Sequence, residues 1–393
     1  MTYTVKTYNQ IAPEGLNFLK QAGYIVEDSD HPDAILLRSH SLHQQKLTDS
    51  VLAIGRAGAG TNNIPIDTCT SQGIAVFNTP GANANAVKEL VLANLLLAVR
   101  PILKGTEWIN HLDSHAISSE VEINKKQFAG TELEGKTLGV IGLGAIGSRV
   151  ANDAYQIGMN VLGYDPHVSI DTAWKMSRRV QRVLDLQDIF SEADFITIHI
   201  PLLPETKHFI GKKELSKMKP NTVLLNFSRG ELVDNPAVLK AAANGGIAKY
   251  ITDFPVEELL HQPNITLLPH LGASTEEAEI NCAKSAARTL QYYLETGNIR
   301  HSVNLPTVDM TFNSPYRISV LHQNIPNMIG AISQLVAQKN INIHNLTNRS
   351  RGEVAYTLVD LDETALDMAQ SIVSDIQQNS AVIRTRLITN TKI

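Results

Sequence analysis

The fold of the central part of this chain is decided by residues 136–165, which read KTLGVIGLGAIGSRVANDAYQIGMNVLGYD. A short apolar run over 138–141 predicts a strand, residues 148–157 predict a helix, and a second apolar run over 159–164 predicts another strand. The turn between the first strand and the helix comprises Gly142, Leu143, Gly144, Ala145, Ile146 and Gly147. Strand, glycine turn, helix and strand in this order are typical of a dinucleotide-binding unit.

The glycines of this turn each meet a separate steric demand. Gly142 allows the tight turn, Gly144 lets a pyrophosphate approach the backbone, and Gly147 lets the helix pack closely on the strand. The N-terminus of the following helix then offers N–H groups to the phosphates. Asp165, directly after the second strand, would accept hydrogen bonds from the ribose hydroxyls and repel a 2′-phosphate. The sequence therefore predicts an NAD site and favours NAD over NADP.

Length and composition set the class of protein. The chain has 393 residues, 43% of them hydrophobic and 19% charged, with a net charge of −5. This length predicts two or three domains, and the charge gives no basic field for nucleic acid or membrane. Cys69 and Cys282 stand in no metal-binding or redox spacing, so we expect no metal and a reducing compartment. We expect a cytoplasmic protein.

Apolar runs alternate with helical stretches through most of the chain, which predicts doubly wound parallel sheets. The expected strands lie at 5–8, 34–37, 52–54 and 76–77, and beyond the glycine turn at 195–201, 222–226, 247–252 and 265–268. Long helices are expected from Ala86 to about Leu112 and over 276–296, and a linker over 304–315. The remainder predicts a βαββαβ, ferredoxin-like module, with strands at 316–321, 341–347, 354–361 and 382–387 and helices at 328–338 and 364–378.

Three polar residues follow expected strands downstream of the nucleotide loop. They are Arg229, Glu257 and His270. Oxidation of an alcohol needs a group that takes the hydroxyl proton, and histidine suits this role near neutral pH. A carboxylate bound to that histidine would orient the ring, and a guanidinium would hold a substrate carboxylate with two parallel bonds. Together they are the set needed to oxidise a 2-hydroxy acid.

The joint pattern resembles the D-isomer-specific 2-hydroxyacid dehydrogenase family over residues 1 to about 310. Matching motifs are Gly142 to Gly147, Asp165, His199-Ile200-Pro201-Leu202, Thr206, Asn226-Phe227-Ser228-Arg229-Gly230, Glu257 and Pro269-His270-Leu271-Gly272-Ala273. The resemblance implies that Arg229, Glu257 and His270 are catalytic. It also implies that NAD contacts Gly142, Gly144, Ala145, Ile146, Gly147, Asp165, Pro201, Thr206, Phe227, Ser228, Arg229, Asp253, His270, Gly272 and Ala273. The family has an aspartate five positions before the catalytic Glu; here Thr252 stands there and Asp253 follows it.

The tail, Tyr316 to Ile393, resembles an ACT domain, a regulatory module that binds amino acids. Family members with such a tail oxidise 3-phospho-D-glycerate to 3-phosphooxypyruvate, the first step of L-serine synthesis, and L-serine inhibits some of them. Substrate positions of those members match Arg38, Ser39, Arg56, Gly58 and Asn83, and serine positions match His322, Asn324 and Asn342. Where the family's ACT turn has Pro-Gly, this chain has Pro326-Asn327. We also expect an exposed sheet edge and face in this module, which a second copy would cover in a homo-oligomer, a dimer or a tetramer. The serine site is then expected between the ACT domains of two subunits.

The expected domains are a substrate-binding domain (1–95 and 276–310), an inserted Rossmann-type NAD-binding domain (96–275) and the ACT domain (316–393). Arg56 could hold a phosphate or support Arg38, and the pattern favours neither. His199 ends an apolar strand and is expected to be structural. Two other functions stay open. One is reduction of glyoxylate, hydroxypyruvate or 2-oxoglutarate, and the other is NADH sensing without catalysis.

Overall fold

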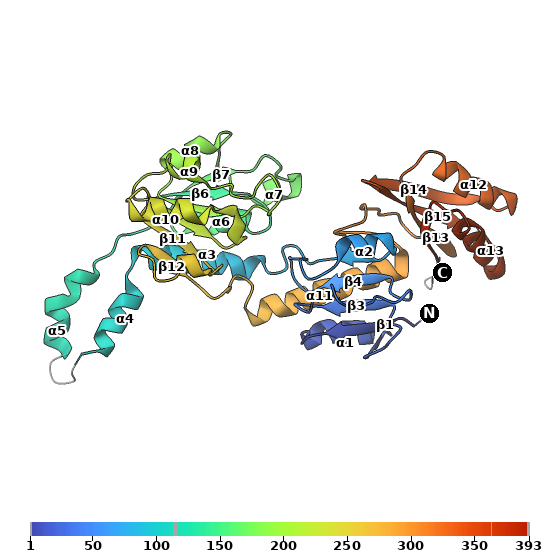
Figure 1. Cartoon of the computed structure of the whole chain (residues 1–393), viewed down its shortest axis with the longest axis horizontal. Coiled ribbons are helices and arrows are strands. Elements are labelled where there is room, and N and C mark those ends of the chain that lie inside the picture. The colour runs from blue at the N-terminus through green and yellow to red at the C-terminus, as the bar shows by residue number, and fades with distance from the viewer. Residues whose placement is uncertain (1, 113–116, 363, 391–393) are drawn as a thin grey trace. The chain divides into compact units, whose positions relative to one another are not determined.

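The computed structural model describes residues 2–112, 117–362 and 364–390. They form two compact units, one made of 1–83 with 279–393 and the other of 84–278. Figure 1 shows two parallel sheets with flanking helices and a smaller antiparallel sheet at the C-terminal end of the chain. The predicted α/β fold class is confirmed. No helix among the described residues is both long enough and apolar enough to cross a bilayer.

The unit 84–278 is built on a seven-stranded sheet in the order β12-β11-β10-β9-β6-β7-β8. Its strands are β6 (Thr137–Ile141), β7 (Asn160–Tyr164), β8 (Gln181–Arg182), β9 (Phe195–Ile198), β10 (Val223–Asn226), β11 (Lys249–Thr252) and β12 (Ile265–Leu267). All of the strand pairs are parallel. Successive strands are added on one side of β6 up to β8 and on its other side from β9 to β12, so the strand order reverses between β6 and β9. Ligands of such sheets bind at this switch point, beyond the carboxyl ends of the strands.

Helices lie on both faces of the sheet, while α4 and α5 extend away from it (Figure 1). The helices of this unit are α3 (Ala84–Val99), α4 (Ile102–Asn110), α5 (Ile117–Asn124), α6 (Gly147–Gln156), α7 (Ile170–Lys175), α8 (Leu186–Glu192), α9 (Lys212–Leu215) and α10 (Asn235–Ala243), with 3₁₀ turns η1 (Lys125–Phe128), η2 (Gly230–Leu232) and η3 (Glu257–Leu259). The prediction of a single helix from Ala86 to about Leu112 is wrong. The helix is interrupted between α3 and α4, because Pro101 supplies no N–H and disfavours a helical conformation at Arg100.

The second unit begins with a five-stranded parallel sheet in the order β2-β1-β3-β4-β5. Its elements are β1 (Thr4–Tyr8), α1 (Pro13–Gln21), β2 (Ile25–Val26), β3 (Ala34–Leu37), β4 (Ala53–Arg56), α2 (Ile66–Ser71) and β5 (Ala75–Phe77). The late helix α11 (Glu276–Thr296) packs on this sheet and on α1. A Cβ on Gly15 would lie 2.8 Å from Ala283, and one on Gly55 would lie 2.9 Å from Leu290. Helix α11 therefore completes the core of the first sheet.

The tail folds as predicted into a βαββαβ module with the antiparallel order β14-β15-β13-β16. Its elements are β13 (Tyr316–Gln323), α12 (Met328–Gln338), β14 (Ile343–Arg351), β15 (Val354–Leu361), α13 (Leu366–Gln377) and β16 (Val382–Thr389). The two helices bury one face of the sheet around Ile318, Val320, Ile332 and Val359. Residues 304–315 contain no helix or strand, as expected of a linker.

The other face of the tail sheet is covered, and the expectation of an exposed face is wrong. Leu321, Tyr356 and Leu358 belong to one buried cluster with Leu290 and Phe77, which lie in the same compact unit as the tail. Every residue of β15 is buried, because helices lie on one side of it and α11 on the other. The edge strand β14 remains mostly exposed.

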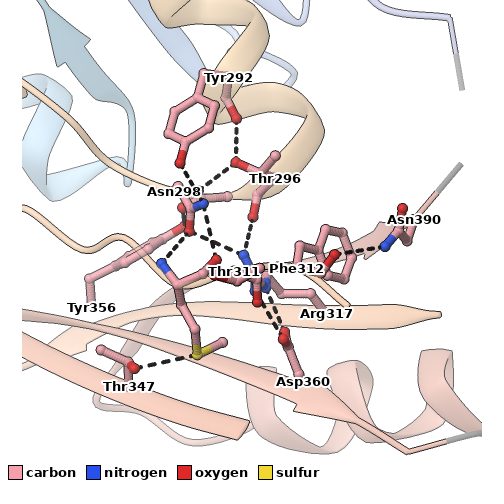
Figure 2. A network of polar contacts seen from close by, with 12 residues as sticks. Tyr292, Thr296, Asn298, Thr311, Phe312, Arg317, Thr347, Tyr356, Asp360 and Asn390 are labelled. Atoms are coloured by element: carbon pink, nitrogen blue, oxygen red, sulfur yellow. Dashed lines mark hydrogen bonds and ion pairs between the residues drawn. The ribbon is translucent and has the colours of Figure 1, made fainter. Parts of the chain in front are cut away.

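A buried arginine links the tail to the end of α11 and to the linker (Figure 2). Arg317 is fully buried and forms an ion pair with Asp360 on the adjacent strand. It also donates to the carbonyl oxygens of Thr296 and Thr311, both at 2.9 Å, and to Asn298 Oδ1 at 3.1 Å. All of these acceptors lie within the same compact unit. A single guanidinium thus joins the strand, the helix end and the linker.

Candidate active site

The three predicted catalytic residues follow three adjacent parallel strands. Arg229 comes after β10, Glu257 after β11 and His270 after β12. In the sheet these strands are neighbours, with β11 paired to both of the others. All three side chains are exposed at the carboxyl edge. The sheet therefore places the three groups at the edge where ligands of this fold bind.

The loop after β10 is held by a buried amide. Asn226 donates from Nδ2 to the carbonyl oxygen of Arg229 at 2.8 Å and accepts from the Ser228 N–H at 3.2 Å. Ser228 Oγ donates to the carbonyl oxygen of Ile198 at 2.7 Å, which ties the loop to β9. The sequence pointed to this loop through Arg229, but the supporting role of Asn226 is visible only in the structure.

The His270 ring rests on an aromatic side chain. His270 has a left-handed backbone (φ +49°), and its N–H donates to the carbonyl oxygens of Asp253 and Leu268, both at 3.0 Å. Its ring lies 5.1 Å from the Phe254 ring, in an edge-on arrangement. A Cβ added to Gly230 would lie 3.2 Å from Phe254. Phe254 thus contacts the His270 ring and the residue next to Arg229, a role that the sequence did not suggest.

Asp253 lies inward, beneath the loop that contains His270. It is 1% exposed, and its Oδ2 accepts from the Gly272 N–H at 2.8 Å. Its Oδ1 is buried and has no hydrogen-bond partner among the described residues. Burial raises the pKa of this carboxyl, against the opposing effects of the Gly272 N–H and His270. Asp253 therefore anchors the loop, and its predicted contact with NAD stays a prediction.

Glu257 opens the short turn η3, which follows β11. No hydrogen bond or ion pair joins it to His270 within the described part of the chain. Catalytic hydrogen bonds are often long in the absence of substrate and shorten in the complex. The pairing of Glu257 with His270 therefore remains a prediction.

The glycine turn has the shape that a dinucleotide site requires. A Cβ on Gly147 would lie 1.9 Å from the carbonyl oxygen of Gly142, and one on Gly142, with φ of +90°, would lie 2.5 Å from that of His199. Gly144 has open space where a Cβ would stand. Asp165, at the end of β7, accepts from the Leu143 N–H at 2.8 Å. The turn, the start of α6 and Asp165 thus fit a pyrophosphate and its ribose.

Two more predicted cofactor positions, Pro201 and Thr206, lie in the loop after β9, the strand next to β6. Thr206 Oγ1 donates to the carbonyl oxygen of Pro201 and accepts from the Leu203 N–H, both at 2.7 Å, so it closes the loop after β9. His199 lies just before that loop, and burial lowers the pKa of its ring to about 3. Its Nε2 contacts Thr197 Oγ1 at 3.0 Å. A neutral, enclosed ring agrees with the expected structural role.

The predicted substrate residues of the first sheet lie at strand ends in the other unit. Arg38 follows β3 and forms a 2.7 Å ion pair with Glu279. Arg56 ends β4, donates to the Arg38 carbonyl oxygen at 3.1 Å, and crowds Gly58. Ser39 donates its N–H to Asn9, and Asn83 immediately precedes α3. The structure shows Arg56 supporting the Arg38 backbone and leaves a phosphate contact as a prediction.

A cavity of 260 Å³ opens in the tail at the start of α12. His322 and Asn324, two of the predicted effector residues, line it. Asn342 does not line it and instead donates to Asp362 at 2.7 Å. Asn348, which the sequence did not indicate, lines the cavity as well. The structure thus brings two of the three predicted effector residues together within one chain.

Comparisons with known proteins agree with this geometry. The model of the D-isomer specific 2-hydroxyacid dehydrogenase NAD-binding domain matches residues 92–272. The chain is 31% identical to a putative D-3-phosphoglycerate dehydrogenase of Schizosaccharomyces pombe, over 95% of this chain and 85% of that one. It is 32% identical to the D-3-phosphoglycerate dehydrogenase of Escherichia coli, over 86% of this chain and 82% of that one. A third enzyme of that name, from Synechocystis, is 40% identical, over 70% of this chain and 49% of that one.

Solved structures show the same fold. The NAD⁺-bound 3-phosphoglycerate dehydrogenase of Entamoeba histolytica superimposes with a TM-score of 0.59 at 25% identity, over 77% of this chain and 99% of that one. An NAD complex of a D-isomer specific 2-hydroxyacid dehydrogenase from Lactobacillus delbrueckii superimposes with a TM-score of 0.63 at 24% identity, over 77% of this chain and all of that one.

Fold, site and relatives define an NAD-dependent oxidoreductase of 2-hydroxy acids, and the chain belongs to the D-isomer-specific 2-hydroxyacid dehydrogenase family. Within that family, relatives that span most of this chain carry the name D-3-phosphoglycerate dehydrogenase.

Proposed function

We propose that this enzyme oxidises 3-phospho-D-glycerate to 3-phosphooxypyruvate, the first step of L-serine synthesis, in the cytoplasm. The observation that carries the proposal is the set of Arg229, Glu257 and His270 on adjacent strand ends beside an NAD site. The names of the relatives supply the substrate. Both cysteines are free and buried, which supports a reducing compartment.

The proposed chemistry uses each side chain for one task. The glycine turn and Asp165 would hold NAD, which when bound would supply the acceptor for the hydride that leaves C2 of the substrate. The His270 imidazole takes the proton of the C2 hydroxyl as the carbonyl forms, and Arg229 holds the neighbouring carboxylate by charge-assisted hydrogen bonds. Glu257 stabilises the imidazolium that results. Arg38 offers a positive charge to the phosphate once it exchanges its ion pair with Glu279.

An initial-rate assay tests this proposal. NADH formation is expected with 3-phospho-D-glycerate, and the reverse reaction is expected to be slower with glyoxylate, hydroxypyruvate and 2-oxoglutarate than with 3-phosphooxypyruvate. His270→Ala should remove at least about a hundredfold of the rate, because general acid–base catalysis typically supplies 10²–10⁴-fold. Equal rates in His270→Ala and the parent, or a preference for an unphosphorylated acid, would contradict it.

L-Serine is proposed to regulate the enzyme through the cavity at the start of α12. His322 and Asn324 in its lining support this, together with the ACT-like fold of the tail. Calorimetry should show saturable serine binding to the parent and at least tenfold weaker binding to Asn324→Ala. Identical isotherms for the two proteins, or no binding to either, would refute the regulatory role.

The homo-oligomer is proposed to form through the pair α4 and α5, which extends away from the sheet of its own unit (Figure 1). Apolar side chains are exposed on it, including Leu103 (67%) and Ile123 (72%), and such surfaces mark protein contacts. Light scattering should show a smaller assembly for Leu103→Glu with Ile123→Glu. Trp174→Glu, at an exposed position of α7, is the matched control and should leave the assembly unchanged.

A further inference from the structure

The loop after β3 is held on both sides of Arg38. Asn9, which has a left-handed backbone (φ +66°), accepts through Oδ1 from the N–H groups of Ser39 at 3.1 Å and His40 at 2.6 Å. Asn63 donates through Nδ2 to the carbonyl oxygens of Arg38 at 3.2 Å and His40 at 2.7 Å. These bonds fix the backbone of the loop, so a change of partner at Arg38 is made by its side chain alone.

The Arg38 guanidinium is paired with a carboxylate of α11 in the same compact unit. Its Nη1 lies 2.7 Å from Glu279 Oε1, and the two side chains are 37% and 44% exposed. Ion pairs with this degree of exposure are weak, because solvent screens the charges and both long side chains lose conformational freedom. The pair lies beyond the carboxyl end of β3, where ligands of parallel sheets bind. An anionic ligand can therefore displace Glu279 from Arg38 at small cost.

Arg56 lies close to this pair but is held against the backbone. Its Nε donates to the Arg38 carbonyl oxygen at 3.1 Å, and its Nη1 lies 2.0 Å from the place of a Cβ on Gly58. Burial raises the pKa of the Cys282 thiol on α11, against the opposing effects of Arg56 and Arg38. Glu279 acts on the same thiol in the opposite sense, so all three charged groups lie near it. Two guanidinium groups and one carboxylate leave a single net positive charge at this edge of the sheet.

The charge of a ligand decides whether it can take Arg38 from Glu279. A phosphate monoester carries a charge of about −1.5 to −2 at pH 7, and a guanidinium binds it with paired hydrogen bonds. The Glu279 carboxylate carries one negative charge, so a phosphate is the stronger ligand of Arg38. An uncharged substituent such as a hydroxymethyl group leaves the ion pair intact.

We propose that Glu279 is an internal competitor for Arg38 and sets the affinity of the site for phosphorylated substrates. The substrate phosphate displaces the carboxylate when it binds, and the carboxylate pairs with Arg38 again when the phosphorylated product leaves. Glu279 is thus a positioning residue, which acts on the substrate only through Arg38. The inference rests on the proposed oxidation of 3-phospho-D-glycerate, because it requires that the phosphate binds at Arg38.

The test measures the reverse reaction of the full chain with two substrates that differ only in the phosphate. Glu279→Gln removes the charge and keeps the shape of the side chain. Its KM for 3-phosphooxypyruvate should fall about two- to fivefold, as expected from the strength of an exposed ion pair, while kcat stays within about twofold. Its KM for hydroxypyruvate should not change. Glu277→Gln removes the same charge from an exposed position of the same helical turn and should leave both KM values unchanged.

The direction of the change separates competition from support. If Glu279 orients Arg38 for the phosphate, KM for 3-phosphooxypyruvate rises in Glu279→Gln, which would overturn the inference. An unchanged KM would overturn it as well. Equal changes with hydroxypyruvate, or in Glu277→Gln, would show a general electrostatic effect and have the same consequence.

Inorganic phosphate tests the ion pair without a phosphorylated substrate. The rise in melting temperature of the full chain with phosphate concentration gives its affinity. That affinity should be about two- to fivefold higher in Glu279→Gln than in the parent and Glu277→Gln. If this holds but the parent does not reduce 3-phosphooxypyruvate, the proposed function fails and the competition at Arg38 stands. If the parent reduces 3-phosphooxypyruvate but phosphate binds all three proteins equally, the competition fails and the proposed function stands.

Discussion

Phe254 is the side chain on which the position of His270 depends. It meets the His270 ring edge-on, and its Cβ lies where a side chain at Gly230 would crowd it. Phe254→Ala should lower kcat/KM about 10–100-fold, because a displacement near 1 Å at a reacting group can cost that much. Phe254→Leu should retain most of the rate, and NAD affinity should stay within twofold in both. Equal steady-state rates for Phe254→Ala and the parent would exclude this positioning role.

The buried Asp253 carboxyl gives the unit 84–278 a pH dependence with a defined sign. Burial raises its pKa in the folded state. Between the ordinary carboxyl pKa and this raised pKa, the folded state holds a proton that the unfolded state has released. The free energy of unfolding therefore falls as the pH rises through this interval. Asp253→Asn should lack that fall while its amide oxygen still accepts from Gly272. Urea unfolding across a pH series measures this, and parallel curves for the two proteins would contradict it.

At the scale of elements, the glycine turn separates folding from binding. Gly147→Ala should prevent folding of the unit 84–278, because its Cβ would lie 1.9 Å from a backbone oxygen. Gly144→Ala meets nothing in the protein, so its melting temperature should match that of the parent. Its NAD affinity should still fall at least tenfold, because the methyl group stands where the pyrophosphate approaches. An unchanged NAD dissociation constant for Gly144→Ala would contradict binding of the pyrophosphate at this turn.

Most of the elements could be predicted because their signals are local. The helix 276–296 and the strand 354–361 match the structure residue for residue, since apolar periodicity and turn residues mark their ends. The sequence predicts a helix that is too long at Pro101, because the apolar pattern continues past the proline. The supporting roles of Asn226 and Phe254, and the place of Asn348 in the lining of the tail cavity, could not be predicted. They depend on which loops contact one another in the folded protein, and the spacing of residues along the sequence does not indicate those contacts.

At the scale of the whole molecule, the tail behaves as part of the first sheet's unit. Leu321, Tyr356 and Leu358 share a core with Phe77 and Leu290. A chain that ends at Phe312 would expose that core, so we expect it to lose the thermal transition of the unit 1–83/279–393. The transition of the unit 84–278, whose midpoint temperature NAD binding raises, should remain in the truncated chain. Scanning calorimetry with and without NAD measures both, with Asn324→Ala as the full-length control. A truncated chain with both transitions and full activity would contradict the shared core.

The shared core also sets the order in which the chain can mature on the ribosome. Residues 1–83 emerge first, but α11 and the tail strands that complete their core come only after residue 275. At about 5–20 residues per second, the wait is roughly 15–60 s. The unit 84–278 is continuous and can fold within that interval. The first sheet to be synthesised is therefore the last to be finished, and until α11 and the tail arrive, the apolar face that they cover is the part of the nascent chain most in need of a chaperone.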